Sequence, residues 1–87
     1  MHEASLMTDL MRKIETVARE QNVTKVLRIS VKLGALSHMS PSHFRDHFSV
    51  VSQGTLAEGA TLDIEVLTDA HDPHAQEILL ESVEIAD

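Results

Sequence analysis

The chain opens with Met1-His2-Glu3, which places an imidazole one residue away from a free α-amine. His2 is too bulky for the usual aminopeptidase to remove the initiator methionine, so we expect Met1 to remain. The Met1 amine, the His2 backbone nitrogen and the His2 ring nitrogen can then close fused chelate rings around one divalent ion, with the Glu3 amide as fourth donor. A square-planar set of four nitrogens favours Ni(II) or Cu(II). The alternative is that His2 binds nothing, because chain ends commonly fray.

Three more histidines lie in or before a segment with helical periodicity. His43 and His47 are four residues apart, so their rings lie on one side of a helix and could bind a metal jointly. The alternative is that both are exposed polar positions of an amphipathic helix. His38, in the preceding loop, could approach either this pair or the N-terminus, although a lone loop histidine commonly has no ligand role.

The remaining histidines belong to His71-Asp72-Pro73-His74. Two imidazoles and the Asp72 carboxylate could form a weak secondary metal site. The alternative is a polar turn fixed by Asp72-Pro73, because this pair is common in turns. Glu3 has two possible roles. Its carboxylate could orient His2 as a hydrogen-bond acceptor, or it could stabilise the start of a helix through the helix dipole.

Hydrophobic periodicity predicts the first two elements that position these residues. A helix is expected from about residue 4 to 21, with Met7 and Met11 as core filler rather than metal ligands. Its apolar stripe comprises Leu6, Leu10, Ile14, Val17 and Ala18. A strand follows, in which Leu27, Ile29, Val31 and Leu33 form the buried face and Gly34 ends the element.

A second helix and two further strands complete the pattern. Ser40 can cap the helix and Pro41 suits its first position. The buried stripe of this helix is Phe44, Phe48 and Val51. Gly54 and Gly59 then lead into a strand with Leu62, Ile64 and Val66 on one face. Residues 78–85 form the last strand, with Leu79, Val83 and Ile85 on one face and Glu81 breaking the alternation, which suggests a sheet edge.

The expected fold class is therefore α/β (α+β), with two helices packed on one face of a three-stranded sheet in the order α-β-α-β-β. A connection at about 68–76 joins the last two strands. The other sheet face should be polar or covered by a partner, because it carries Arg28, Lys32, Asp63 and Glu65. Exposed sheet edges would allow a homodimer or an exchange of strands.

Composition narrows the function classes. The 87 residues fit one domain, 1–87, and 43% are apolar without a run long enough for a membrane span, so we predict a cytoplasmic protein. The net charge of −7 disfavours nucleic acid and anionic membranes. The chain has no cysteine nucleophile, no glycine-rich phosphate loop and no Gly-x-Ser-x-Gly elbow, so we expect a protein that is not an enzyme.

Three short motifs together resemble the HypA/HybF family of nickel metallochaperones. They are Met1-His2-Glu3-Ala4-Ser5-Leu6, Val31-Lys32-Leu33-Gly34-Ala35-Leu36-Ser37 and Gly54-Thr55-Leu56-Ala57-Glu58-Gly59-Ala60. Their spacing matches the family without gaps from Met1 to about Val66. The resemblance implies a protein that binds Ni(II) at its N-terminus and delivers it in the maturation of a nickel enzyme, [NiFe]-hydrogenase or urease. It also implies two partners, a HypB-like maturation GTPase and the hydrogenase large subunit.

The chain departs from this family in one respect. Family members carry a zinc lobe with two Cys-x-x-Cys pairs between the last two strands, whereas residues 68–76 stand in its place here and the chain has no cysteine. A tetrathiolate zinc site cannot form, so no structural zinc is expected. Two alternatives therefore stay open. One is a protein-interaction or assembly subunit that keeps the fold without binding metal, and the other is a binder of another divalent metal through His43, His47 and the 71–74 segment.

Overall fold

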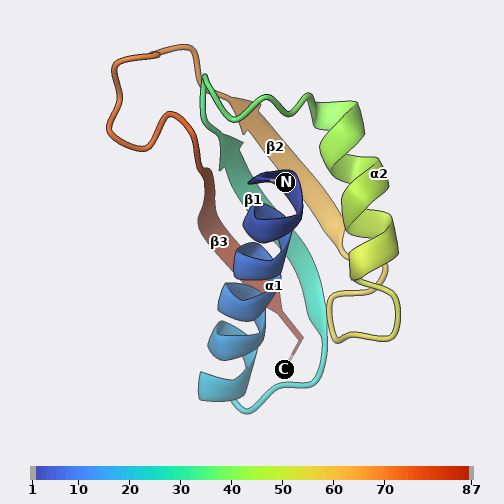
Figure 1. The fold of residues 1–87 in the computed structure, drawn as a ribbon. Helices are drawn as coiled ribbons and strands as arrows, with labels where there is room; N and C mark the ends of the chain where they lie inside the picture. Colours follow the sequence, from blue (N-terminus) through green and yellow to red (C-terminus); the bar gives the residue numbers. More distant parts are fainter. Residues whose placement is uncertain (1, 87) are drawn as a thin grey trace.

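The computed structural model describes residues 2–86 of the chain, and side chains from Ser5 onward. Two helices and three strands follow one another in the predicted order, α-β-α-β-β (Figure 1). The elements are α1 (His2–Glu20), β1 (Val26–Leu33), α2 (Pro41–Val51), β2 (Thr61–Val66) and β3 (Ile78–Ile85). Among the described residues, no helix is both long and apolar enough to cross a membrane.

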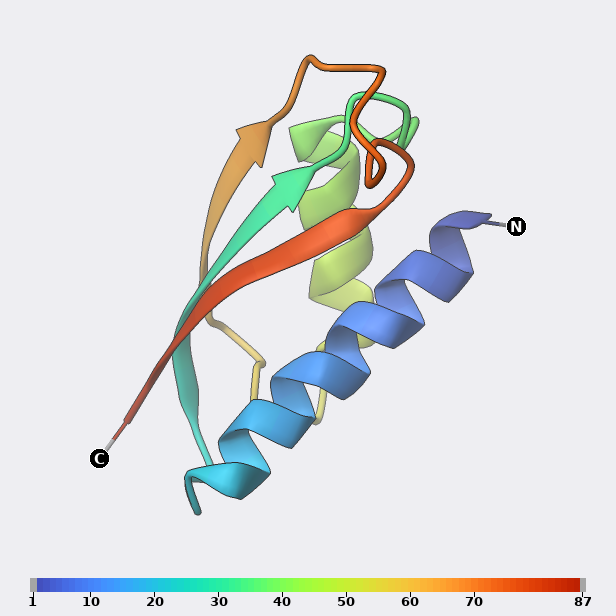
Figure 2. The same cartoon turned by 90° about the vertical axis from the view of Figure 1, so that its left-hand side faces the viewer.

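The three strands form a mixed sheet in the order β2-β1-β3. Strand β1 lies in the centre, parallel to β2 and antiparallel to β3. Helix α2 connects β1 to β2, because two parallel strands can be joined only by a crossover connection. Both helices pack on the same face of this sheet, as predicted (Figure 2). The predicted fold class is confirmed.

A bulge near the start of β1 changes which of its side chains are buried. Val26 pairs with Ile85 and Arg28 with Glu84, so Leu27 is an extra residue in β1 with no partner in β3. Val26 is fully buried, whereas Leu27 is 43% exposed. The prediction that Leu27 lies on the core face was therefore wrong, because strict alternation does not continue through a bulge.

A second bulge has the same effect in β3. Ser30 pairs with Ser82 and Val31 with Leu80, which leaves Glu81 as the extra residue. The core face of β3 therefore contains Ile78 and Leu80 before the bulge, and Val83 and Ile85 after it. The prediction placed Leu79 on this face and was wrong for that reason. Strand β3 is an edge strand, as the charge of Glu81 had indicated.

Methionine contributes more to the helix–sheet core than the periodicity of α1 predicted. Met7 and Met11 are buried together with Leu10, Ile14 and Ala18. Leu6 is only partly buried. The interpretation of Met7 and Met11 as core residues is confirmed, which fits the ability of methionine to fill irregular gaps.

The ends of the helices follow local backbone chemistry. Asn22 adopts φ 57° after α1, and the Val23 N–H donates to the Ala18 carbonyl at 3.0 Å, which closes the helix in a Schellman arrangement. The Ser40 hydroxyl oxygen caps α2 by accepting from the His43 N–H at 3.2 Å, and Pro41 follows at the first helical position. The predicted start of α2 is confirmed.

The sheet face opposite the helices is lined with ion pairs. Arg28, in the central strand, lies 2.8 Å from Asp63 of β2 and 3.6 Å from Glu84 of β3. Lys32 lies 3.7 Å from Glu81. The predicted polar character of this face is confirmed, and both of its cations, Arg28 and Lys32, pair with carboxylates on neighbouring strands. Hydrogen bonding to Asp63 and its negative charge raise the pKa of Arg28.

Candidate metal-binding site

The proposed N-terminal chelate lies at the start of α1. The helix begins at His2. Met1 and the side chains of His2 and Glu3 lie outside the residues that the structure describes, so their role as nickel ligands stays a prediction. The backbone of His2 and Glu3 is helical, and this conformation bears on the chelate in two ways.

First, the backbone nitrogens needed for the chelate belong to the first turn of a helix. The first four N–H groups of an α-helix have no acceptor within the helix. Use of the His2 and Glu3 amide nitrogens by a metal therefore breaks no hydrogen bond of α1. Among the side chains that the structure describes, the first core contacts of the helix are those of Leu6 and Met7.

Second, the charge of such a chelate is compatible with this position. A helix N-terminus carries about half a positive charge, which repels a bare cation. Two deprotonated amide nitrogens, from His2 and Glu3, would neutralise the divalent ion. A donor set of this kind therefore suits the start of α1 better than a site that leaves the ion charged.

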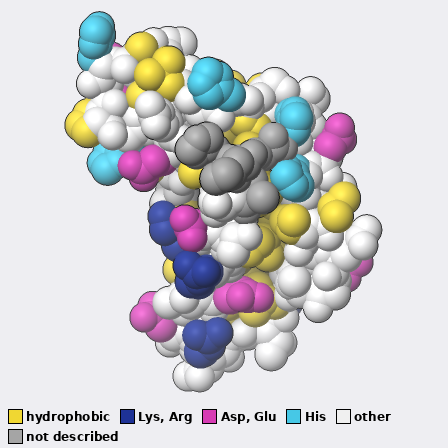
Figure 3. Space-filling model, in the orientation of Figure 1, with side chains coloured by type: hydrophobic (Ala, Val, Ile, Leu, Met, Phe, Trp, Pro, Cys, Tyr) yellow, Lys and Arg dark blue, Asp and Glu magenta, His cyan; other side chains and the backbone are white. Residues whose placement is uncertain are grey.

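The other histidines lie at the same end of the molecule as the start of α1. Both helices begin near the end of the sheet where β1 and β2 finish (Figure 1). His38 lies in the loop that follows β1, His43 and His47 lie in the first two turns of α2, and His71 and His74 lie in the connection after β2. In the space-filling view the histidine side chains gather over this end (Figure 3).

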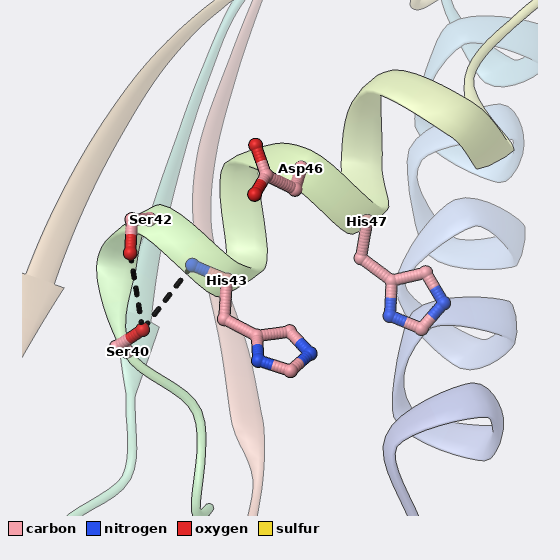
Figure 4. Close-up of a pocket in the computed structure, with 5 residues that line it drawn as sticks. All are labelled: Ser40, Ser42, His43, Asp46 and His47. Carbon is pink, nitrogen blue, oxygen red and sulfur yellow. Dashed lines mark hydrogen bonds between the residues drawn. The ribbon is translucent and has the colours of Figure 1, made fainter.

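His43 and His47 are brought together by the helix. Their ring centroids are 6.3 Å apart, and the rings are inclined at 44° to one another. Figure 4 shows both rings projecting from the same side of α2, whereas Asp46 projects from the opposite side. Together with Ser40 and Ser42, these three residues line a shallow depression. The predicted pairing of the two imidazoles on one helix side is confirmed, and metal binding by them stays a prediction.

Asp72 organises a turn in the connection between β2 and β3. Its carboxylate accepts a hydrogen bond from the His74 N–H at 2.7 Å, and its carbonyl accepts from the Ala75 N–H at 3.0 Å. The Asp69 carboxylate accepts from the His71 N–H in the same manner, at 2.9 Å. These contacts are those of the polar turn that Asp72-Pro73 predicted as the alternative to a metal site.

His74 has a carboxylate partner within this connection. Its Nδ1 lies 3.0 Å from Glu77 Oε2. Hydrogen bonding to Glu77 and its negative charge raise the pKa of His74, with a smaller contribution from the charge of Asp72. A proton therefore competes more strongly with a metal for this ring than for an ordinary histidine.

The described histidines and carboxylates do not assemble into a larger ligand cluster. Over the side chains that the structure describes, no group of three or more His, Cys, Asp or Glu residues is placed to hold a metal ion. His38 is exposed and adopts the left-handed backbone conformation, with φ 59°. Metal binding by His38, His71, Asp72 and His74 stays a prediction.

Sequence reasoning missed the contact that fixes the connection. Gly34 was expected only to end β1, but its N–H donates to the Glu77 carbonyl at 2.9 Å, and the Leu36 N–H donates to the Ala75 carbonyl at 2.7 Å. Ala75 is only 4% exposed. The only sequence signal for this close contact is the Gly-Ala pair at 34–35 after a buried strand, and such pairs also occur in ordinary turns.

The fold defines a class of small α+β proteins in which one layer of two helices covers a three-stranded mixed sheet. The sequence profile of the family described as "HypA: Hydrogenase/urease nickel incorporation, metallochaperone, hypA" matches residues 1–71. The chain belongs to the HypA family.

Individual relatives agree with this assignment. The hydrogenase maturation factor HypA of Methylocella silvestris is 42% identical over 67 residues, which cover 77% of this chain and 59% of the relative. The protein of the same name from Acidithiobacillus ferrooxidans is 44% identical over 64 residues, which cover 74% of this chain and 57% of the relative. The chain therefore spans less than two thirds of the length of these relatives.

Two solved structures share the fold. The solution structure of the Ni metallochaperone HypA from Helicobacter pylori superposes with a TM-score of 0.77 at 23% identity, covering 98% of this chain and 97% of that chain. A second structure, described as "Solution structure of HypA protein", gives a TM-score of 0.71 at 24% identity, covering 99% of this chain and 97% of that chain. At such identities, the likeness supports the architecture and not the ligand set.

Proposed function

We propose that this protein is a nickel metallochaperone. It binds Ni(II) through Met1, His2 and Glu3 and delivers the ion during maturation of a nickel enzyme, [NiFe]-hydrogenase. Nickel is the cargo in this proposal, and the protein performs no catalytic step.

The observation that carries the proposal is the match of the family profile from residue 1 to residue 71. The matched region includes the Met1-His2-Glu3 start, whose amine, amide and imidazole nitrogens form a donor set suited to Ni(II). The description of that family names nickel incorporation for hydrogenase and urease.

Two features of the molecule support binding at this position. The chain carries a net charge of −7, which raises the local concentration of cations. The start of α1 leaves amide nitrogens without helical acceptors, so the metal competes with water rather than with the fold.

The partners follow from the same family membership. We propose a HypB-like GTPase as the partner in nickel delivery and the hydrogenase large subunit as the recipient. The 67–77 connection occupies the place between the last two strands and contains no cysteine, so docking of either partner would use surfaces other than a tetrathiolate zinc lobe.

Nickel affinity should fall steeply as the pH is lowered. Protons compete with the ion for the His2 ring, the Met1 amine and the amide nitrogens, so acid removes the donors. Between about pH 7.5 and about pH 5.5 we expect the Ni(II) affinity to fall by at least about a hundredfold. Calorimetric titration at several pH values measures this. A flat affinity over that range would contradict ligation by these nitrogens.

A matched variant makes this experiment specific. His71→Ala removes an exposed histidine from the 67–77 connection and leaves α1 unchanged. It should reproduce the pH dependence of the unmodified protein. If His71→Ala flattened the dependence instead, the titrating ligand would lie in the connection and not at the N-terminus.

A further inference from the structure

We propose that His43 and His47 form a second metal site, separate from the N-terminal chelate, that holds one borderline divalent cation such as Ni(II), Cu(II) or Zn(II) through two imidazoles and water. This second site rests on the geometry of α2, and its existence does not depend on the proposed function.

The spacing of the two rings fits a shared ion after a small adjustment. Metal–nitrogen bonds of about 2.1 Å place two ring centroids about 5.3 Å apart around a tetrahedral ion and about 6.5 Å apart when the nitrogens oppose one another. The observed separation is 6.3 Å. The required approach of at most about 1 Å lies within reach of side-chain torsions on an exposed helix face.

The helix backbone that carries the two rings is held in place. Phe44 is fully buried and Phe48 is 3% exposed, and their rings stack with centroids 6.0 Å apart. Ser40 fixes the first turn as the cap. Because each histidine precedes a buried phenylalanine by one residue, the core sets the direction of both imidazoles. Only the histidine side chains need to move on binding.

The environment suits a cation that exchanges readily. His43 is exposed and His47 is half-buried, so water can complete the coordination. Asp46 also lines the depression and adds negative charge, although its carboxylate points away from the two imidazole rings (Figure 4). Both histidines make further interactions in the structure, which a bound metal would compete with. With only two protein ligands, the pair binds an ion more weakly than a site in which the protein supplies all four ligands.

The donor type determines which metals fit. Neutral imidazole nitrogens suit Ni(II), Cu(II) and Zn(II), whereas Mg(II) and Ca(II) prefer oxygen ligands. No third ligand reaches the pair among the described side chains. Two imidazoles completed by water form a donor set that these borderline ions accept.

Calorimetric titration of NiCl2 into the His2→Ala variant tests the pair without the N-terminal chelate. We expect one weak equivalent of Ni(II) to remain, and His43→Ala/His47→Ala in that background to weaken it at least tenfold. NMR of the imidazole nitrogens should show the His43 and His47 signals broadening together as Ni(II) is added. An unchanged weak equivalent in the combined variant would overturn the proposal.

Two matched variants test the geometry. His71→Ala/His74→Ala removes as many histidines from the 67–77 connection and should leave the weak equivalent intact. His47→Ala/Val50→His keeps the number of histidines on α2 but places them seven residues apart, too far for one ion; Val50 is 62% exposed and tolerates the change. This second variant should bind as weakly as the double alanine variant. Retained binding in it would overturn the proposal, as would loss of binding in His71→Ala/His74→Ala.

The outcomes separate this proposal from the N-terminal one. If the proposed function fails, His2→Ala leaves the tight equivalent in place, and His43→Ala/His47→Ala in otherwise unmodified protein then reports on the pair alone. If the pair fails, the tight equivalent still disappears with His2→Ala, while the two α2 variants change nothing.

Discussion

Replacement of His2 by alanine is expected to lower the affinity of the protein for Ni(II) by at least about a hundredfold, or about 2.7 kcal/mol. Loss of a residue that merely hydrogen-bonds to a metal ligand commonly costs about 10–100-fold, and His2 would donate to the metal directly. Calorimetry of tag-free protein measures the change. Delivery of nickel to a hydrogenase precursor should fall in parallel.

The same variant should leave the fold intact. Residue 2 is the first residue of α1, a position where helices commonly fray, and the first core contacts among the described side chains are those of Leu6 and Met7. The free energy of unfolding should therefore change by less than about 0.5 kcal/mol. His71→Ala is the matched control for removal of one histidine. If His2→Ala lowered affinity by less than about tenfold, the ligands would have to be sought elsewhere.

Partner binding distinguishes the two classes of function. Under the metallochaperone proposal, His2→Ala abolishes nickel transfer while docking to a GTPase partner survives. A subunit with a purely structural role in assembly would support maturation equally well with either residue at position 2. Hydrogenase activity in cells that carry His2→Ala as their only copy separates these outcomes.

The substitution Gly34→Ala is expected to destabilise the fold by about 2–4 kcal/mol, which corresponds to a fall in Tm of roughly 10–20 °C. A Cβ at Gly34 would collide with the Ala75 carbonyl and would lie 2.8 Å from the His74 carbonyl oxygen. These are backbone atoms, so no side-chain rotation relieves the collision and the 67–77 connection must move. This movement would expose Ala75 and break the two backbone hydrogen bonds that Gly34 and Leu36 donate to the connection.

Thermal unfolding and amide hydrogen exchange measure the effect of Gly34→Ala. The amides of Gly34 and Leu36 should lose protection, because their acceptors are the Glu77 and Ala75 carbonyls. Gly54→Ala is the matched control, since Gly54 has φ 76° but no atom within 4 Å of an added Cβ. It should cost only about 1 kcal/mol. Equal effects of the two substitutions would show that the Gly34 contact is not tight.

Most of the fold could be predicted from the sequence because each element has a strong local signal. Ser40-Pro41 marks the start of α2 through capping chemistry, and Phe44 and Phe48 show its buried side. The bulges at Leu27 and Glu81 could not be predicted, because the register between β1 and β3 is set by pairing across the sheet. Strand order is likewise a tertiary property: β3 follows β2 in the chain but pairs with β1.

The candidate site could be predicted only where the helix alone sets the geometry. A spacing of four residues places His43 and His47 side by side in any helix, and the structure has them so. In contrast, the role of Glu77 beside His74 depends on the turn built by Asp72. The N-terminal ligand set rests on the chemistry of the first three residues and on family membership.

The central claim is that the Met1 amine and the residues after it bind nickel. Acetylation of this amine removes one donor and alters no side chain, so a comparison of Ni(II) titrations into free and acetylated protein tests the claim most directly. We predict one tight equivalent in the free protein and, in the acetylated protein, an affinity at least about a hundredfold lower. Equally tight binding of Ni(II) by both forms would contradict the N-terminal site.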